Sequence, residues 1–156
     1  MKKRIFAVLL VAAVILSLAM FASCNNEPAE EEIEEEPVSI TVRIKITGDD
    51  GNVLVDEDVQ MTDLPSKLTA LAATTRVLEI DEIDHEEQDG MFERIAEYDN
   101  YEYSDEEKEE KELSADLIAG MFWMIKINGS DSVSSATLLK DGDNIEWTFK
   151  EEVWQE

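Results

Sequence analysis

The sequence has little cysteine, histidine and positive charge. Its 156 residues include one cysteine, Cys24, one histidine, His85, and 13 lysine and arginine residues against 38 aspartate and glutamate residues. A single cysteine excludes a disulfide within the chain, so the folded part must be stabilised by its core alone. The shortage of basic residues opposes nucleic-acid binding, because that affinity rests largely on lysine and arginine contacts to phosphate. We therefore expect no nucleic-acid partner.

The sequence also lacks the motifs that mark common enzyme classes. It contains no P-loop, no glycine-rich dinucleotide fingerprint and no serine-centred nucleophile motif. His85 lies in the charged stretch EIDHEEQ, where one imidazole makes at most a fragment of a zinc site. The aspartates of KDGD, Asp141 and Asp143, do not have EF-hand spacing and more simply form a turn. We predict a protein that is not an enzyme and has no cofactor or metal centre.

One long apolar run is present, at the N-terminus. MKKRIFAVLLVAAVILSLAMFASC has a cationic start, an apolar stretch from Ile5 to Ala22 and small residues before Cys24, the order of an export signal. The ending Phe21-Ala22-Ser23-Cys24 resembles the lipobox of bacterial lipoproteins, in which the cysteine receives a diacylglyceryl group and becomes the new N-terminus. This resemblance implies a signal peptide over residues 1–23. A retained transmembrane helix and simple secretion are the alternatives, since about 18 apolar residues can just span a bilayer.

Lipidation at Cys24 implies a protein that acyl chains hold at the extracytoplasmic face of the cell membrane. Removing residues 1–23 takes away three basic residues and no acid, so ten basic residues remain against 38 acids, a formal charge of −28. Such a charge repels anionic headgroups, so the lipid must provide the membrane contact. The segment 24–37 is rich in glutamate and nearly free of apolar residues. We predict a disordered acidic tether there.

The folded domain is predicted over residues 38–156. In VSITVRIKIT, from Val38, apolar and polar residues alternate, which indicates a strand with one buried face. GDDGN is a turn signal, and NVLVDEDVQM resumes the alternation, so we expect a β-hairpin. The next segment, with Thr62 or Asp63 as its cap and Pro65 near its start, has helical spacing. Its apolar stripe consists of Leu64, Leu68, Leu71, Ala72, Thr75 and Leu78. Two strands followed by an amphipathic helix predict an α+β domain.

The middle of the chain has a weaker pattern. DEIDHEEQDG is interpreted as a solvated loop, and MFERIAEYDNYEY as a segment that can contain a strand with Phe92, Ile95 and Tyr98 inward. An acidic insert at about residues 99–113 contains SDEEKEEKE, for which a short exposed helix and disorder are both open.

Two aromatic strands close the sequence. GMFWMIKINGS places Trp123, Ile125 and Ile127 on one parity and ends at Asn-Gly, which favours a turn. After KDGD, NIEWTFK is a half-buried strand with Trp147 and Phe149 inward. We expect Trp123, Trp147 and Phe149 in the core beneath the helix stripe of Leu64, Leu68 and Leu71, with a ligand platform as the alternative for the indoles.

The motifs WMIKING (123–129) and LKDGDNIEW (139–147), in this order of elements, resemble the transcobalamin C-terminal-like β-grasp domain, a module often found without assigned function on bacterial surface lipoproteins. The resemblance covers roughly residues 38–150 and implies a mixed sheet with one main helix on one face. In transcobalamin-type proteins this domain helps to close over a corrinoid together with a helical domain. The printed sequence has no counterpart of that helical domain, so corrinoid binding stays an alternative only.

In a β-grasp sheet the first strand lies beside the last. If the indoles face the helix, two large apolar side chains and four basic ones share the opposite sheet face: Phe122, Met124, Lys126, Arg43, Lys45 and Lys150. Cross-strand pairing with Glu146 and incidental exposure are the simpler interpretation. The functional interpretation is a docking face. We expect non-catalytic binding of a soluble ligand or an envelope protein, with a structural or adhesive surface role as the alternative.

Overall fold

The computed structural model describes residues 35–131 and 133–155. The predicted signal peptide, Cys24 and most of the predicted tether lie outside these ranges. Within them, no helix is both long and apolar enough to cross a membrane.

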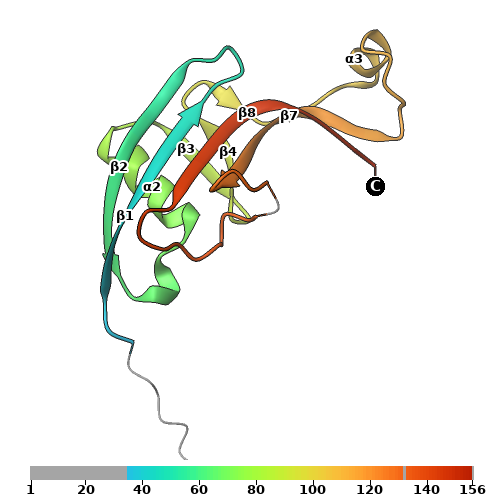
Figure 1. The fold of residues 1–156 in the computed structure, drawn as a ribbon. Coiled ribbons are helices and arrows are strands. Elements are labelled where there is room, and N and C mark those ends of the chain that lie inside the picture. Colours follow the sequence, from blue (N-terminus) through green and yellow to red (C-terminus); the bar gives the residue numbers. More distant parts are fainter. Residues whose placement is uncertain (1–34, 132, 156) are drawn as a thin grey trace, which may run out of the picture. The chain divides into compact units, whose positions relative to one another are not determined.

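A five-stranded mixed sheet forms the body of the domain (Figure 1). Its first two strands form the predicted antiparallel hairpin, and the first strand pairs in parallel with the last. The last strand also pairs antiparallel with the strand before it. In spatial order the strands are β2 (Val53–Asp63), β1 (Val38–Thr47), β8 (Asn144–Gln155), β7 (Leu117–Ile127) and β6 (Tyr101–Glu102).

One main helix, α2 (Ala70–Ile80), packs on one face of this sheet, so the domain belongs to the α+β class, as predicted. The helix begins later than predicted. The 3-10 turn η1 (Pro65–Lys67) precedes it, and Thr69 rather than Thr62 or Asp63 caps it, with Oγ1 accepting the Ala72 N–H at 3.2 Å.

The residues of α2 that face the core also differ from those predicted. Leu64, Leu71, Ala72 and Thr75 were expected on the buried stripe but are only half-buried. The buried face instead consists of Ala70, Ala73, Thr74, Val77 and Leu78. Three of these residues are small, which lets the helix approach the bulky residues of the sheet closely.

The segment expected to be a solvated loop forms the first strand of a second, three-stranded sheet. The strands are β3 (His85–Gln88), β4 (Met91–Ile95) and β5 (Tyr98–Asp99). Arg94 joins them: its guanidinium lies 2.8 Å from Asp84, 2.8 Å from Glu86 and 3.4 Å from Asp99. The sequence of β3 was interpreted as a loop because it is highly charged. In the structure, part of this charge forms ion pairs between strands. Phe92, Ile95 and Tyr98 face the core as predicted.

The acidic insert contains a short exposed helix, α3 (Asp105–Glu110). Ser104 and Glu107 form a capping box, in which Ser104 Oγ accepts the Glu107 N–H and the Glu107 carboxylate accepts the Ser104 N–H. Of the two alternatives for SDEEKEEKE, the structure has the helix.

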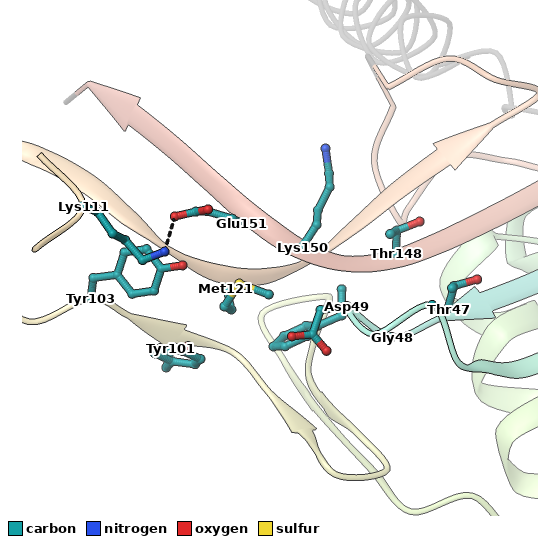
Figure 2. Close-up of a pocket in the computed structure, with 12 residues that line it drawn as sticks. Thr47, Gly48, Asp49, Tyr101, Tyr103, Lys111, Met121, Thr148, Lys150 and Glu151 are labelled. Carbon is teal, nitrogen blue, oxygen red and sulfur yellow. Dashed lines mark ion pairs between the residues drawn. The ribbon is translucent and has the colours of Figure 1, made fainter. Parts of the chain in front are cut away.

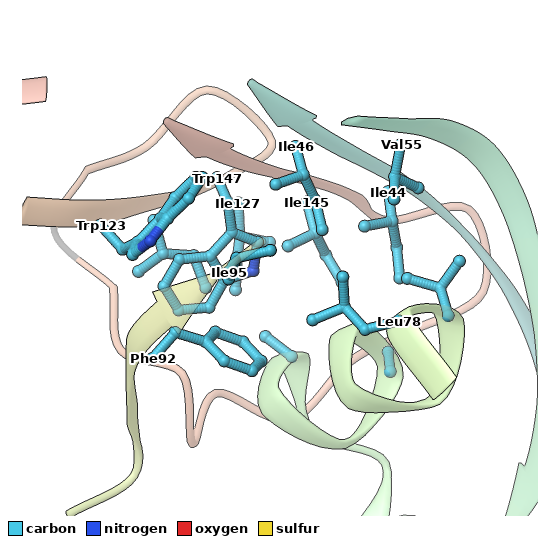
Figure 3. Close-up of a cluster of buried hydrophobic side chains, with 14 of the residues drawn as sticks. Ile44, Ile46, Val55, Leu78, Phe92, Ile95, Trp123, Ile127, Ile145 and Trp147 are labelled. Carbon is cyan, nitrogen blue, oxygen red and sulfur yellow. The ribbon is translucent and has the colours of Figure 1, made fainter. Parts of the chain in front are cut away.

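The core lies between the large sheet on one side and α2 with the small sheet on the other (Figure 3). Trp147 is fully buried; its indole N–H donates to Thr74 Oγ1 at 2.9 Å and its ring meets Phe92 edge-on. Trp123 is also buried, with 1% exposed. It lies under β5 rather than under α2, and its indole N–H donates to the Tyr98 carbonyl at 3.0 Å. The expectation that Trp123 packs beneath the leucines of the helix is therefore wrong, since the small sheet covers it.

Candidate functional site

The face of the large sheet opposite α2 is called here the outer face. It carries the odd-numbered residues of β1 and the even-numbered residues of β7 and β8, none of which is buried between Arg43 and Lys45, Phe122 and Lys126, or Asn144 and Lys150. Strand register places Phe122 opposite Lys150, and Lys126 opposite Glu146, which in turn neighbours Lys45. The structure thus brings together all six residues predicted for a docking face: Arg43, Lys45, Phe122, Met124, Lys126 and Lys150.

Acidic neighbours neutralise most of the positive charge on the outer face. Arg43 lies 2.8 Å from Asp56 and 3.3 Å from Asp58, and these bonds, that to Asp58 foremost, raise the pKa of its guanidinium. Lys126 pairs with Asp131 at 3.6 Å, and Lys150 pairs with Glu152. Of the four basic residues, Lys45 alone has no ion pair among the described residues. The face is therefore close to neutral rather than cationic.

Apolar side chains mark the part of the outer face near the C-terminus. The Phe122 and Trp154 rings pack with centroids 4.8 Å apart, and Trp154 is 38% exposed. Beside them is a shallow groove of about 310 Å³, lined by Met124, Lys126, Glu146, Thr148 and Lys150. Sequence reasoning missed Trp154, although the alternation that begins at Asn144 assigns it to the outer face if β8 continues to its position.

A larger hollow, of about 610 Å³, lies where β1 ends beside β8 (Figure 2). Its walls come from the turn after β1, from β6 and the residues after it, and from four consecutive residues of β8. They include Thr47, Gly48, Asp49, Tyr101, Tyr103, Lys111, Met121, Thr148, Phe149, Lys150 and Glu151. Except for Phe149 and Lys150, none of these residues was a sequence candidate, because the hollow depends on the path of the acidic insert.

A compact group of polar side chains occupies one end of this hollow. The Lys111 ammonium lies 3.0 Å from the Glu151 carboxylate and 4.7 Å from the centre of the Tyr103 ring. Lys111 is the main cause of a lowered pKa of Glu151, and Glu151 of a raised pKa of Lys111. Burial, followed by the neighbouring Glu151, raises the pKa of the Tyr103 hydroxyl. This group holds the segment after α3 against β8.

The other sequence candidates have structural partners. His85 Nδ1 lies 3.0 Å from the Ile83 carbonyl, and its ring packs edge-on against Phe92. Asp141 and Asp143 form the turn before β8, where they accept backbone N–H groups of Thr41 and Lys140. Across residues 35–131 and 133–155, histidine, cysteine and carboxylate side chains form no group of three that can hold a metal ion.

Over residues 35–131 and 133–155, the fold and these surfaces define an α+β domain in which α2 and the small sheet cover one face of the large sheet and no element covers the other. No protein-family model matches the chain, and no curated protein matches it significantly. Among solved structures, it is similar to a crystal structure from Ruminococcus gnavus described as a "putative metal binding protein", with 18% identity over 72% of this chain and 98% of that chain. The TM-score of 0.41 is too low for this likeness to carry a functional argument.

Proposed function

We propose that the protein is an exported lipoprotein, anchored through Cys24, whose β-grasp-type domain binds a partner at the cell surface without catalysis. The pairing of β1 with β8 and the position of α2 on one sheet face support the β-grasp assignment. The signal-like residues 1–23 and the acidic segment 24–37 support the anchor and tether.

One observation carries the binding role: no element of the described residues covers the outer face, which presents Phe122, Met124 and Trp154 half-buried or exposed, beside ion-paired basic residues. Apolar groups rimmed by polar ones on an open surface are typical of protein interfaces. The groove of about 310 Å³ on this face lies at the lower limit of the range of about 300–1,000 Å³ for ligand pockets, and with the exposed aromatic pair beside it we infer that it receives a side chain of a protein partner. An envelope protein is therefore the better-supported partner.

Site-specific photo-crosslinking in the native envelope tests this function. A benzophenone amino acid at position 122 is expected to give a discrete adduct, and the same group at Thr62, on the same sheet face but far from the aromatic pair, is expected to give none. Met124→Glu should weaken the adduct at position 122, since it places a charge in the apolar patch. Equal crosslinking from positions 122 and 62 would contradict a docking role for the outer face.

Two further measurements separate the remaining alternatives. A thermal-shift screen of the full chain against corrinoids, calcium and envelope glycans should give a flat result if a protein is the partner, and one clear stabiliser would indicate a soluble ligand instead. A palmitate analogue fed to the cells should label the wild-type protein and not Cys24→Ser. Labelling of Cys24→Ser would contradict the lipid anchor.

A further inference from the structure

Strand β8 extends well beyond its neighbour β1. It pairs with β7 as far as Gln155, opposite Leu117, but with β1 only from Asn144 to Thr148. There β1 ends and the chain turns away, with the Gly48 N–H donating to the Asn52 carbonyl at 2.9 Å. Among the described residues, no strand pairs with residues 149–155 on the β1 side. Figure 1 shows this part of β8 projecting with β7 past the rest of the sheet.

Hydrogen bonds of β7 identify the backbone groups along this edge. The N–H groups of Trp123 and Ile127 donate to Asn100 Oδ1 and the Ser130 carbonyl, so odd-numbered residues of β7 turn away from β8. Their partners in β8, Phe149 and Ile145, are also odd-numbered. In an antiparallel ladder, two opposite residues that do not exchange hydrogen bonds both direct their N–H and C=O groups away from each other, toward the outer edges of the two strands. The N–H and C=O groups of Glu151 and Val153 therefore point to the free edge.

The hollow of about 610 Å³ runs along the same edge. It is lined by Thr148, Phe149, Lys150 and Glu151 in succession. Because alternate side chains of a strand point to opposite faces, four consecutive residues can line one hollow only along the strand's edge. Its remaining apolar wall comes from Met121 and the two tyrosine rings, of which Tyr101 is 48% exposed. An extended chain beside β8 could therefore form hydrogen bonds with the backbone of Glu151 and Val153 and place one side chain in this hollow.

The charges of this region favour a basic occupant. Lys111 and Lys150 are already paired with Glu151 and Glu152, whereas Asp49 has no ion pair within the described ranges. The whole chain has a formal charge of −25, which attracts cations and repels a second copy. Pairing of two β8 edges would also set Glu151 and Glu152 of one copy near those of the other, and like charges across strands are destabilising.

We propose that the free edge of β8, residues 149–155, binds an extended basic peptide segment of another protein by strand addition. The segment takes up the position that β1 leaves at Thr47, its backbone pairs with Glu151 and Val153, and one of its side chains enters the hollow. Main-chain hydrogen bonds provide affinity in this mode, and the pocket provides specificity. The site adjoins the outer face, with which it shares Thr148 and Lys150, but it uses the backbone edge of β8 and does not depend on docking at Phe122.

The first test uses the full chain and the peptide Ac-KVKVKV-NH2, followed by amide NMR. The expected result is saturable shifts at Glu151 and Val153 and slower hydrogen exchange of their N–H groups. Two versions of the peptide carry N-methyl groups on alternate residues, one set in each register. One version should bind roughly tenfold or more weakly and the other like the parent, because only alternate N–H groups face β8. Equal binding of both versions, or no binding of the parent, overturns the proposal.

Two controls separate strand addition from charge attraction. Ac-EVEVEV-NH2 should not bind, and binding equal to that of the lysine peptide would contradict the basic partner. Val153→Pro removes the N–H that faces the edge, and it takes no hydrogen bond from the β7 pairing because the Val153 N–H does not point to β7, so it should weaken the lysine peptide roughly tenfold. Val153→Ala keeps the N–H and should change binding by less than about twofold. Unchanged binding to a folded Val153→Pro overturns the proposal; if that variant does not fold, the N-methylated pair decides.

Discussion

The two halves of the β7–β8 ribbon share one alternation but have different surroundings. In the half near the loop after β7, the inward residues Trp123, Ile127, Ile145 and Trp147 are buried under α2 and the small sheet. In the half near the C-terminus, the same parity continues through Glu151 and Val153, which are exposed. Alternation thus determines which way a side chain points, whereas burial requires a second layer above it.

The half near the loop after β7 is called here the proximal half, and the half near the C-terminus the distal half. The distal half has its own, smaller cover. Tyr103 and Lys111 lie over its inner side, and the ion pair with Glu151 fixes them there. Because this cover is thin and polar, it leaves the hollow and the free edge of β8 open. We expect substitutions in the proximal half to affect global stability and those in the distal half to affect local order and binding.

The largest expected effect is that of Trp147→Ala. This change removes a fully buried indole, its edge-on contact with Phe92 and its hydrogen bond to Thr74. Large-to-small changes of aromatic core residues cost about 3–5 kcal/mol of unfolding free energy. Denaturant unfolding should show this loss as a lower midpoint, and a loss below about 1 kcal/mol would contradict the two-layer core.

Gly120→Ala is expected to come next, because it acts where the two halves meet. A methyl group at this position would lie 2.1 Å from the Tyr101 carbonyl oxygen and 2.8 Å from Glu102 Cα, both in the backbone of β6. Overpacking of this kind costs about 1–3 kcal/mol and should detach β6. Amide hydrogen exchange at Tyr101 and Tyr103 should therefore become faster.

Gly129→Ala is the matched control for that change. Its new methyl group has no atom within 4 Å, but the φ of +78° is left-handed, so it should cost about 1 kcal/mol without affecting β6. If Gly129→Ala speeds exchange at Tyr101 as much as Gly120→Ala does, steric contact with β6 is not the cause.

Much of the large sheet could be predicted from the sequence. The alternation in VSITVRIKIT, FWMIKI and NIEWTF indicates three strands and their buried faces, and it places Phe122, Met124 and Lys126 together on the outer face. The helix register could not be read in this way, because leucines at helical spacing, such as Leu64 and Leu71, outweigh alanines in any hydrophobic pattern. The small residues Ala70, Ala73 and Thr74 are selected by contact, which is a tertiary property.

The hollow and the free edge were not predictable for a related reason. Tyr103, Lys111 and Glu151 are distant in sequence and meet only because α3 returns the acidic insert to β8. The free edge depends on where β1 ends relative to β8, and register is set by pairing rather than by composition.

Trp154→Ala is expected to have a small effect on stability. The residue is the distal, outer counterpart of Trp147; it is 38% exposed, and its ring packs at a tilt against Phe122 with centroids 4.8 Å apart. The loss of this aromatic pair should cost about 0.5–1.5 kcal/mol. Denaturant unfolding measures this loss, and in the photo-crosslinking experiment the same substitution should also weaken any adduct formed from position 122. A loss as large as that of Trp147→Ala would contradict the distinction between the two halves.

The smallest expected effect is a local one of pH on the distal half. Lys111 and Tyr103 hold the pKa of Glu151 below its ordinary value of 4.5, so this carboxylate favours the folded state above pH 4.5, and the contribution is lost as the pH falls through the lower folded value. Protonation of the other acids relieves repulsion in a chain of net charge −25 and acts in the opposite direction, so global unfolding is not the appropriate measurement.

A carboxyl-carbon NMR titration of Glu151, with amide exchange of residues 104–111, isolates this effect. The carbon should titrate below pH 4.5, and exchange in α3 should accelerate over the same interval while the indole of Trp147 stays protected. Glu151→Gln should give fast exchange in α3 at every pH, because the ion pair that holds Lys111 is already absent. A Glu151 that titrates at or above its ordinary value would mean that Lys111 does not hold the insert against β8, and the hollow would then lose the wall that shapes it.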